Sequence, residues 1–263
     1  MMKYALDNVE GVLIGGRLLK DVRFPDDQAM ISSSKEGLQR LMDSLGKAAE
    51  TMVISKTGTK IIDIKTGQYE IEQVRQFKYL GATIRDDGGC DLEIKCRIAM
   101  AKQAYIKKRS LLTSNICLSL RKRLMKALVW SVLLYGCETW IMEKSVKSRL
   151  EAFEMWIWRR MAKVSWKDKR TNEEVLQIVG ESRKLLQKIQ ERKKNWIGHV
   201  LRGEGLMLEV MEGRMEEKRG RGRKRIGMLD DPIEFSYREL KRKAQDIERW
   251  RHWMPWTCHK AEN

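Results

Sequence analysis

Phe24-Pro25-Asp26-Asp27 lies between an apolar run that ends at Val22 and a second short run, residues 28–32. The pattern predicts a strand, an acidic turn and a second strand. Adjacent carboxylates repel each other, and a divalent cation is the usual way to neutralise them. Asp26 and Asp27 are therefore candidate Mg²⁺ ligands for phosphoryl transfer. The alternative is structural, because Asp is common at turns, where its side chain bonds to nearby backbone.

After this turn the spacing of apolar residues changes from that of a strand to that of a helix, and then back to that of strands. Ser33 and Glu36 have the spacing of a capping box, and an amphipathic helix is expected after them. Its apolar stripe consists of Leu38, Leu41, Met42, Leu45 and Ala49. Further β-type segments lie at residues 52–55, 60–64, 68–74 and 77–84, the middle two as a hairpin. This order predicts an α+β layer with one helical face.

Beyond residue 90 the strand signals disappear, and apolar stripes with helical spacing replace them. The first consists of Ile94, Ile98, Ala101 and Tyr105, the second of Leu120, Leu124, Leu128, Val132 and Tyr135, and the third of Leu150, Phe153, Ile157, Met161 and Val164. Trp156 and Trp158 fall beside the third stripe, where they either stack on bases or cover a helix junction. Thr171 and Glu174 have capping-box spacing, and a further helix is expected over residues 182–196.

The charge is divided unevenly along the chain. Residues 1–90 hold 13 basic and 13 acidic side chains, so the whole formal charge of +17 belongs to the residues after them. All nine Trp also lie beyond residue 90. A neutral part with an acidic turn thus precedes a basic, Trp-rich part, which indicates a polyanionic partner, either nucleic acid or an anionic membrane surface.

No segment indicates a membrane span or a secreted protein. The longest apolar stretch, residues 127–137, is far shorter than the roughly 20 residues that a bilayer requires. The first residues do not read as a signal peptide. Five cysteines, an odd number at irregular spacing, indicate reduced thiols of an intracellular protein. Nucleus and cytoplasm are not distinguished.

The most specific basic feature is Lys218-Arg219-Gly220-Arg221-Gly222-Arg223-Lys224-Arg225. Glycines between arginines disfavour a helix and let an extended backbone lie close to phosphates or in a minor groove. We therefore expect this run to contact nucleic acid, although a charge run is also common on a solvated surface. The candidate nucleic-acid contacts are Arg219, Arg221, Arg223, Lys224 and Arg225, with Lys188, Arg192, Lys193 and Lys194 on the expected helix before them.

Several segments, taken in order, carry a resemblance to a known family. They are Phe24-Pro25-Asp26-Asp27, the helix at 38–49, Ile54-Ser55-Lys56-Thr57 and Phe77-Lys78-Tyr79-Leu80-Gly81, and then Leu134-Tyr135-Gly136-Cys137-Glu138-Thr139-Trp140, Trp158-Arg159-Arg160-Met161, Ile197-Gly198-His199-Val200-Leu201-Arg202 and residues 219–223. The first four resemble the second half of a reverse-transcriptase palm, in particular that of non-LTR (LINE-type) retrotransposons. The later segments resemble the region C-terminal to the palm in those elements. The resemblance extends to about residue 231.

The resemblance implies a fold and a site. It implies a partial palm over residues 1–90, a helical thumb-like region over 91–165 and a basic helical nucleic-acid-binding region over 166–263. Asp26 and Asp27 match the paired catalytic carboxylates that hold Mg²⁺, and Lys56 matches a lysine near the phosphates of the incoming nucleotide. Residues 77–81 match the primer-grip hairpin. In the intact family, two Mg²⁺ ions support nucleotidyl transfer.

The expected function is that of a fragment of an RNA-directed DNA polymerase, with RNA and DNA as partners. The first metal-binding aspartate of the palm has no counterpart among residues 1–23, where Asp7 and Asp21 lack its setting, so we expect no catalysis by this chain alone. The alternative is a non-catalytic RNA- or DNA-binding protein derived from such an element, and a third interpretation is a decayed fragment. An incomplete palm sheet is also expected to leave an unpaired edge and to favour self-association.

Overall fold

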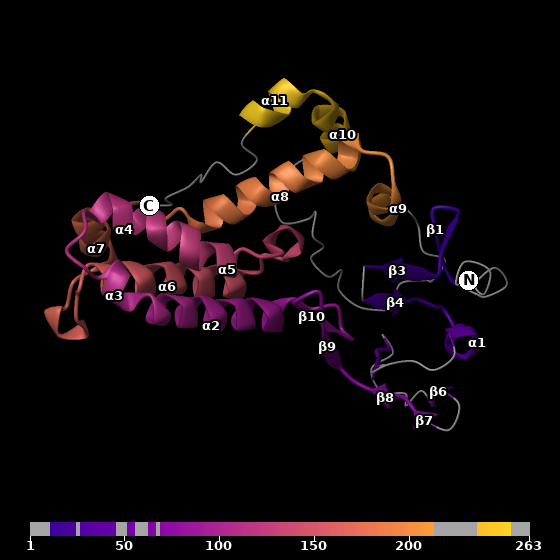
Figure 1. Ribbon diagram of the computed structural model, residues 1–263. Helices are drawn as coiled ribbons and strands as arrows, with labels where there is room; N and C mark the ends of the chain where they lie inside the picture. The colour runs from indigo at the N-terminus through magenta and orange to yellow at the C-terminus, as the bar shows by residue number, and fades with distance from the viewer. Residues whose placement is uncertain are drawn as a thin grey trace. The chain divides into compact units, whose positions relative to one another are not determined.

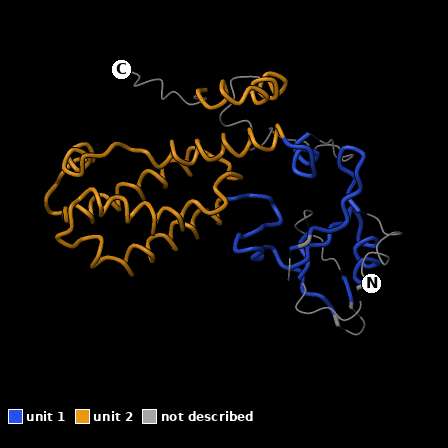
Figure 2. The backbone as a smooth tube through the Cα atoms, turned by 45° about the horizontal axis from the view of Figure 1, so that its top comes forward, with its two compact units in different colours: residues 1–90, 203–223 blue, residues 91–202, 224–263 orange. Residues whose placement is uncertain are grey.

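The computed structural model describes residues 11–24, 27–45, 52–55, 63–66, 69–212 and 236–253. The chain divides into two compact units (Figure 2). Unit 1 comprises Met1–Cys90 with Gly203–Arg223, and unit 2 comprises Asp91–Arg202 with Lys224–Asn263. Within the described ranges the strands all belong to unit 1, and unit 2 is helical (Figure 1). This mixture of helices and short strand pairs is compatible with the predicted α+β class.

The strands of unit 1 are short and, among the described residues, pair two by two. The antiparallel pairs are β1 (Val12–Ile14) with β2 (Arg17–Leu19), β3 (Asp21–Arg23) with β4 (Gln28–Met30), β6 (Lys65–Thr66) with β7 (Tyr69–Glu70), and β9 (Gln76–Tyr79) with β10 (Ala82–Arg85). A parallel pair joins β5 (Met52–Val53) to β8 (Glu72–Gln73). One continuous palm-like sheet is therefore not seen in the described part of unit 1.

The hairpin predicted around the acidic turn is confirmed. Asp21 pairs with Met30 and Val22 with Ala29 across β3 and β4. The Phe24 amide donates to the Asp27 carbonyl at 2.8 Å, and the Asp27 amide donates back to the Phe24 carbonyl at 3.1 Å. This reciprocal pair is the closing bond pair of a tight hairpin.

The amphipathic helix predicted after the hairpin is α1 (Lys35–Leu45). Its cap is Ser34 and not the predicted Ser33, because the Gly37 amide donates to the Ser34 hydroxyl at 3.0 Å. Met42 of α1 packs with Val53 and Ile64 in a small core. Burial of this apolar stripe, more than helix propensity, holds such a short helix in place.

The predicted last strand, residues 77–84, is instead the β9–β10 hairpin. Leu80 and Gly81 between the strands have φ angles of 48° and 77°. Two successive residues with positive φ form the type of turn whose twist matches paired strands. Gly81 suits the second position of this turn. At the first position Asn or Asp is usual, and here Leu80 adopts the left-handed conformation instead.

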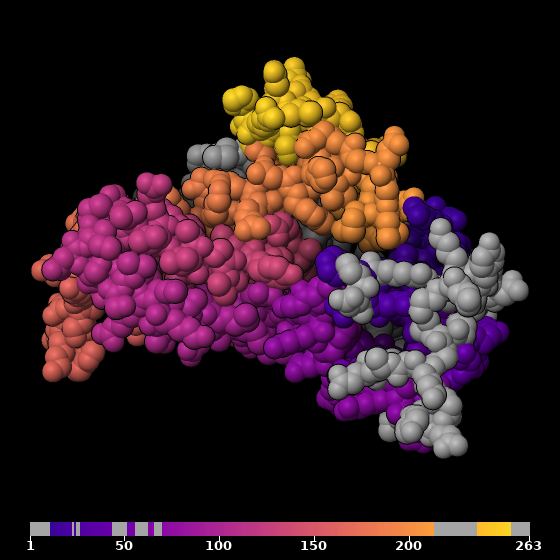
Figure 3. All heavy atoms as spheres, viewed as in Figure 1, coloured from indigo at the N-terminus to yellow at the C-terminus, as the bar shows by residue number. Residues whose placement is uncertain are grey.

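Unit 2 is built from helices of several lengths. They are α2 (Asp91–Lys107), α3 (Arg109–Leu112), α4 (Leu118–Met125), the π-helix η2 (Lys126–Trp130), α5 (Ser131–Leu133), the 3-10 helix η3 (Cys137–Thr139), α6 (Lys144–Met161), the 3-10 helix η4 (Trp166–Asp168), α7 (Asn172–Val179), α8 (Leu185–Arg202), α10 (Tyr237–Gln245) and α11 (Ile247–His252). The helix α9 (Leu206–Glu212) belongs to unit 1. In Figure 3, α10 and α11 (yellow) cover α8 (orange). No described helix is both long and apolar enough to cross a bilayer.

Two of the three predicted stripes form the core of unit 2. On α2, Ile94, Ala101 and Tyr105 are buried, and on α6, Leu150 and Ile157 are. The two helices pack against each other, and α6 also packs against α7 and α8. The capping box predicted at Thr171 is confirmed, with the Glu174 amide donating to the Thr171 hydroxyl at 3.2 Å.

The prediction of the middle stripe was wrong. Leu128 and Tyr135 of that stripe are 37% and 48% exposed, whereas Val129 and Leu133 are fully buried. The offset by one position is already present at Met125, before the π-helix η2 begins, so it belongs to the packing of the whole segment. Because this segment is apolar on more than one side, periodicity did not identify the face that packs.

Candidate nucleic-acid interface

The residues predicted for catalysis lie in unit 1. Asp27 is exposed at the end of the β3–β4 hairpin, and Asp26 and Lys56 lie outside the described residues. The described ranges contain no group of three or more His, Cys, Asp or Glu side chains able to hold a metal ion. The pairing of Asp26 with Asp27 around Mg²⁺ thus stays a prediction.

The segment matched to the primer grip lies beside the acidic hairpin. Phe77 and Tyr79 are half-buried on β9, while Lys78 between them is exposed and Leu80 and Gly81 form the turn. The Tyr79 hydroxyl lies 3.5 Å from the Val22 carbonyl of β3. Both predicted elements of the palm are therefore neighbours within unit 1.

The basic positions predicted on α8 are mostly occupied within the protein. Lys193 is 1% exposed, and its ammonium donates to the Trp140 carbonyl at 2.8 Å. Lys194 is also buried and donates to the Arg251 carbonyl at 3.1 Å, and burial lowers its pKa below the ordinary lysine value. The prediction that Lys193 and Lys194 contact nucleic acid is therefore corrected, because a buried ammonium bound to a carbonyl is not presented to a phosphate.

The two other basic candidates on α8, Lys188 and Arg192, are not buried. Arg192 forms an ion pair with Glu138 at 2.8 Å, and the exposed Lys188 pairs with Glu191 at 3.2 Å on the same helix. The arginine run at 219–225 lies outside the described residues. Its contact with nucleic acid stays a prediction.

A groove at the C-terminal end of α6 gathers aromatic and cationic side chains. Its volume is about 1080 Å³. It is lined by Tyr105 and Ile106 of α2, Arg109 of α3, Thr113, Trp156, Arg159 and Arg160 of α6, and Lys163, Val164, Ser165 and Trp166 after it. None of these described lining residues is acidic. We call this site the α6 groove.

The rim of the α6 groove holds an unusually exposed tryptophan. Trp166 is 84% exposed and begins the 3-10 helix η4. A capping box fixes the backbone there, because the Ser165 amide donates to the Asp168 carboxylate at 2.6 Å and the Lys167 amide donates to the Ser165 hydroxyl at 3.4 Å. The indole is therefore presented to solvent from an ordered turn.

The inner wall of the groove is made by Trp156 and the side chains around it. The Tyr105 ring meets Trp156 edge-on, with 5.3 Å between the ring centres. The Arg160 guanidinium lies 3.9 Å above the centre of the Trp156 ring, which is the geometry of a cation–π contact. Trp158 is fully buried, and Trp156 packs on Tyr105 of α2 while it also lines the groove, so stacking of Trp156 on bases stays a prediction.

The Tyr105 hydroxyl is a polar group without a partner in this wall. Tyr105 is 1% exposed, and its hydroxyl has no hydrogen-bond partner among the described residues. Burial raises the pKa of this hydroxyl above its ordinary value, against the opposing effect of Arg160 and Arg109. Orphaned buried polar groups are rare and call for an explanation.

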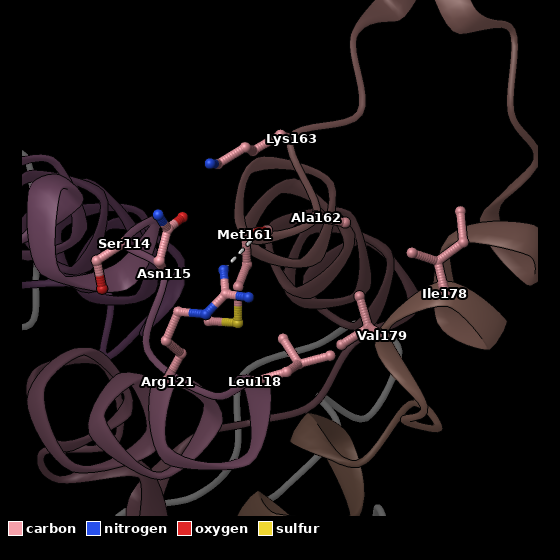
Figure 4. A pocket seen from close by; sticks show the side chains of 9 residues that line it. All are labelled: Ser114, Asn115, Leu118, Arg121, Met161, Ala162, Lys163, Ile178 and Val179. Atoms are coloured by element: carbon pink, nitrogen blue, oxygen red, sulfur yellow. Dashed lines mark hydrogen bonds between the residues drawn. The ribbon is translucent and has the colours of Figure 1, made fainter.

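Two smaller hollows adjoin the α6 groove through shared residues. One, of about 490 Å³, shares Trp156, Arg159 and Arg160 with it and adds Arg183. The other, of about 380 Å³, shares Lys163, and Figure 4 shows the Arg121 guanidinium in it, bonded to the Met161 carbonyl at 3.2 Å. Cations therefore surround the end of α6 on several sides.

Sequence reasoning missed most of the α6 groove. Arg109, Lys163 and Trp166 were not singled out, because they come from three segments that periodicity does not connect. One signal was present. Trp166 stands in a short segment with Lys167, Lys169 and Arg170, which places a large aromatic among cations outside any apolar stripe.

The chain is similar to a protein of transposon origin. An uncharacterized transposon-derived protein of Caenorhabditis elegans is 24% identical to this chain over 206 residues, which cover 72% of this chain and 74% of that protein. No family model matches the chain. No solved structure matches it either. The similarity indicates an origin in a transposable element.

Proposed function

We propose that this chain derives from the reverse transcriptase of a non-LTR retrotransposon and that its helical unit 2 binds RNA or DNA. The similarity to a transposon-derived protein supports the first part. The α6 groove carries the second part, because it combines Trp156 and Trp166 with Arg109, Arg160 and Lys163. Aromatic faces among cations, with no carboxylate between them, suit bases joined by phosphates.

Electrostatics favours the same partner. The formal charge of +17 belongs wholly to the residues after 90, where unit 2 begins. A polyanion releases condensed counterions when basic side chains neutralise its phosphates, and this release drives association. Arg109, Arg160 and Lys163 of the groove are exposed, unlike Lys193 and Lys194, so phosphates can reach them.

Catalysis is a further element of the proposal and rests on the resemblance. Asp26 and Asp27 would hold Mg²⁺, and Lys56 would lie near the phosphates of the incoming nucleotide. The described residues give Asp27 an exposed position at a hairpin end, which a metal and a substrate can reach. The non-catalytic alternative retains the binding function of unit 2 alone.

Binding is tested with fluorescently labelled RNA and DNA by anisotropy over a salt series. Replacing Arg109, Arg160 and Lys163 by Ala is expected to weaken binding at least tenfold at low salt. It should also reduce the log–log salt slope by roughly two units, since each phosphate that is no longer neutralised removes about 0.7 to 0.9.

A matched control keeps the total charge change equal. Arg123→Ala, Lys144→Ala and Arg238→Ala together remove three positive charges from exposed positions of unit 2 outside the groove. A decrease in affinity that is equal in the two triple variants would mean that only net charge matters. Undetectable binding by the unaltered chain at low salt would reject the proposed function.

A further inference from the structure

The exposed face of Trp166 is the starting point. Large aromatic side chains are mostly buried in folded proteins, because they remove so much apolar surface from water. Trp166 is 84% exposed on a turn whose backbone is fixed by a capping box. The position is thus held in place while its side chain is left without apolar cover from the described residues.

The surroundings of Trp166 narrow the chemistry of a ligand that could cover it. Lys163 and Arg109 line the same groove, and Lys167 comes directly after Trp166 with its ammonium 6.0 Å from the ring centre. An apolar protein segment would gain nothing from these cations. A ligand with flat π faces and regularly spaced negative charges satisfies both kinds of side chain.

We propose, resting on the proposed function, that the α6 groove is a site for an unpaired segment of nucleic acid, in which a base stacks on Trp166. In a duplex each base face except those at the two ends is covered by the next base pair, so the body of a duplex could use only the cations of the groove. An unpaired strand offers both a base face and phosphates on either side of it. Single-stranded RNA and DNA share this chemistry.

The inner wall supports the same occupant. Trp156 lines this wall, but its ring is already in contact with Tyr105, Phe153 and Arg160, so Trp166 is the indole whose face is available to a base. The Tyr105 hydroxyl leaves a donor and acceptor in this wall without a partner among the described residues. Base edges carry both donors and acceptors, which is the chemistry that this hydroxyl lacks.

The test compares Trp166→Ala with the unaltered chain on two labelled probes. One probe is a 12-nucleotide single strand without self-complementarity, made as RNA and as DNA, and the other is a long duplex of the same base composition, in which few base faces are terminal. Trp166→Ala is expected to weaken binding of the single strand roughly 5- to 150-fold, the range measured for removal of one base–aromatic stack. Binding of the duplex should change by less than about twofold, because the cations remain.

Two further variants make the result specific. Trp166→Phe should retain most of the single-strand affinity, since a phenyl ring still stacks. Met100→Ala removes a side chain of unit 2 that is 49% exposed and lies outside the groove, and it should leave both probes unaffected. Because Trp166 contributes little to the core, circular dichroism and the unfolding midpoint should be unchanged in both Trp166 variants.

The outcomes separate this inference from the proposed function. Unchanged single-strand affinity in Trp166→Ala, or equal decreases on single strand and duplex, would overturn the stacking site while leaving nucleic-acid binding intact. If the Arg109, Arg160 and Lys163 variant also bound normally, the whole groove would be excluded. A difference between the RNA and DNA strands would show which of the two the site prefers.

Discussion

A single carboxylate joins two helices of unit 2. Glu154 of α6 is 1% exposed and accepts the Lys184 amide at 3.0 Å and the Leu185 amide at 3.3 Å. These amides belong to the start of α8, where the first N–H groups have no partner within their own helix. A carboxylate is favoured there by the helix dipole as well. Glu154 therefore caps a helix that begins about 30 residues further along the chain.

The stability of the fold should depend on the charge of Glu154. Burial raises the pKa of the Glu154 carboxyl above its ordinary value, more than the amides of Lys184 and Leu185 lower it. A raised folded-state pKa means that folding favours the protonated form. The contribution of this group to stability is thus fully present below the unfolded pKa and is lost as the pH rises through the folded pKa.

Urea unfolding at several pH values from about 4 to 8 measures this effect. Glu154→Gln keeps an oxygen acceptor for the amides and removes the titration, so its free energy of unfolding should fall less with rising pH than that of the unaltered chain. The exposed Glu143 provides the control, and Glu143→Gln should retain the original pH dependence. Parallel pH profiles for all three proteins would contradict the assignment.

At the level of elements, α8 is held by the helical hairpin α10–α11. The Arg202 guanidinium donates to the Ala244 carbonyl at 2.8 Å, and the Gln245 side-chain amide donates to the Leu201 carbonyl at 3.2 Å. Trp250 of α11 packs directly on Gly198, where an added Cβ would collide with the indole ring. The segment at 197–202 that contributes to the family resemblance is thus explained in part by packing.

Gly198→Ala should destabilise the protein. In an isolated helix this change gains about 1 kcal/mol of propensity. Overpacking against Trp250 should cost about 1–3 kcal/mol, so a net decrease in stability is expected. Chemical denaturation of Gly198→Ala measures it, with His199→Ala at the exposed neighbouring position as the control.

A double-mutant cycle identifies the contact. Trp250→Ala should be destabilising by itself, but the further change of Gly198 to Ala should then cost little or even stabilise, because the collision is gone. If Gly198→Ala destabilised equally with and without Trp250, the close packing of α11 on α8 would not be its cause.

At the scale of the whole molecule, the distribution of charge decides how binding depends on salt. The basic run at 219–225 and the α6 groove both belong to the part that carries the +17 charge. Replacing Arg219, Arg221, Arg223 and Arg225 by Ala should lower the log–log salt slope by up to about three units, at about 0.7 to 0.9 for each phosphate that the variant no longer neutralises. Anisotropy titrations on a duplex from low to high salt measure this slope.

The salt slope of the Arg109, Arg160 and Lys163 variant is measured beside that of the four-arginine variant. Removal of the four arginines should weaken binding of single strand and duplex alike, because phosphates are common to both. An unchanged slope would show that these arginines are only solvated surface. It would leave the α6 groove and the other exposed basic residues of unit 2 as the sites of phosphate contact.

Local patterns in the sequence determined a large part of the fold. The hairpin around Asp27, helix α1 and the stripes of α2 and α6 are consequences of period and turn chemistry, since each involves residues close together in the chain. The cap at Thr171 was found for the same reason, because its two bonds span only three residues.

Only the tertiary structure decided which side chains of a helix meet a partner. The carbonyls that bind Lys193 and Lys194 lie 53 and 57 positions away in the chain, so no local pattern could separate these buried lysines from the exposed Lys188. The buried face of η2 and α5 depended on their packing against α2. The α6 groove depended on bringing Arg109, Trp156 and Trp166 together from separate segments. Periodicity specifies the faces of an element, and packing against distant segments specifies which face is buried and which remains for a ligand.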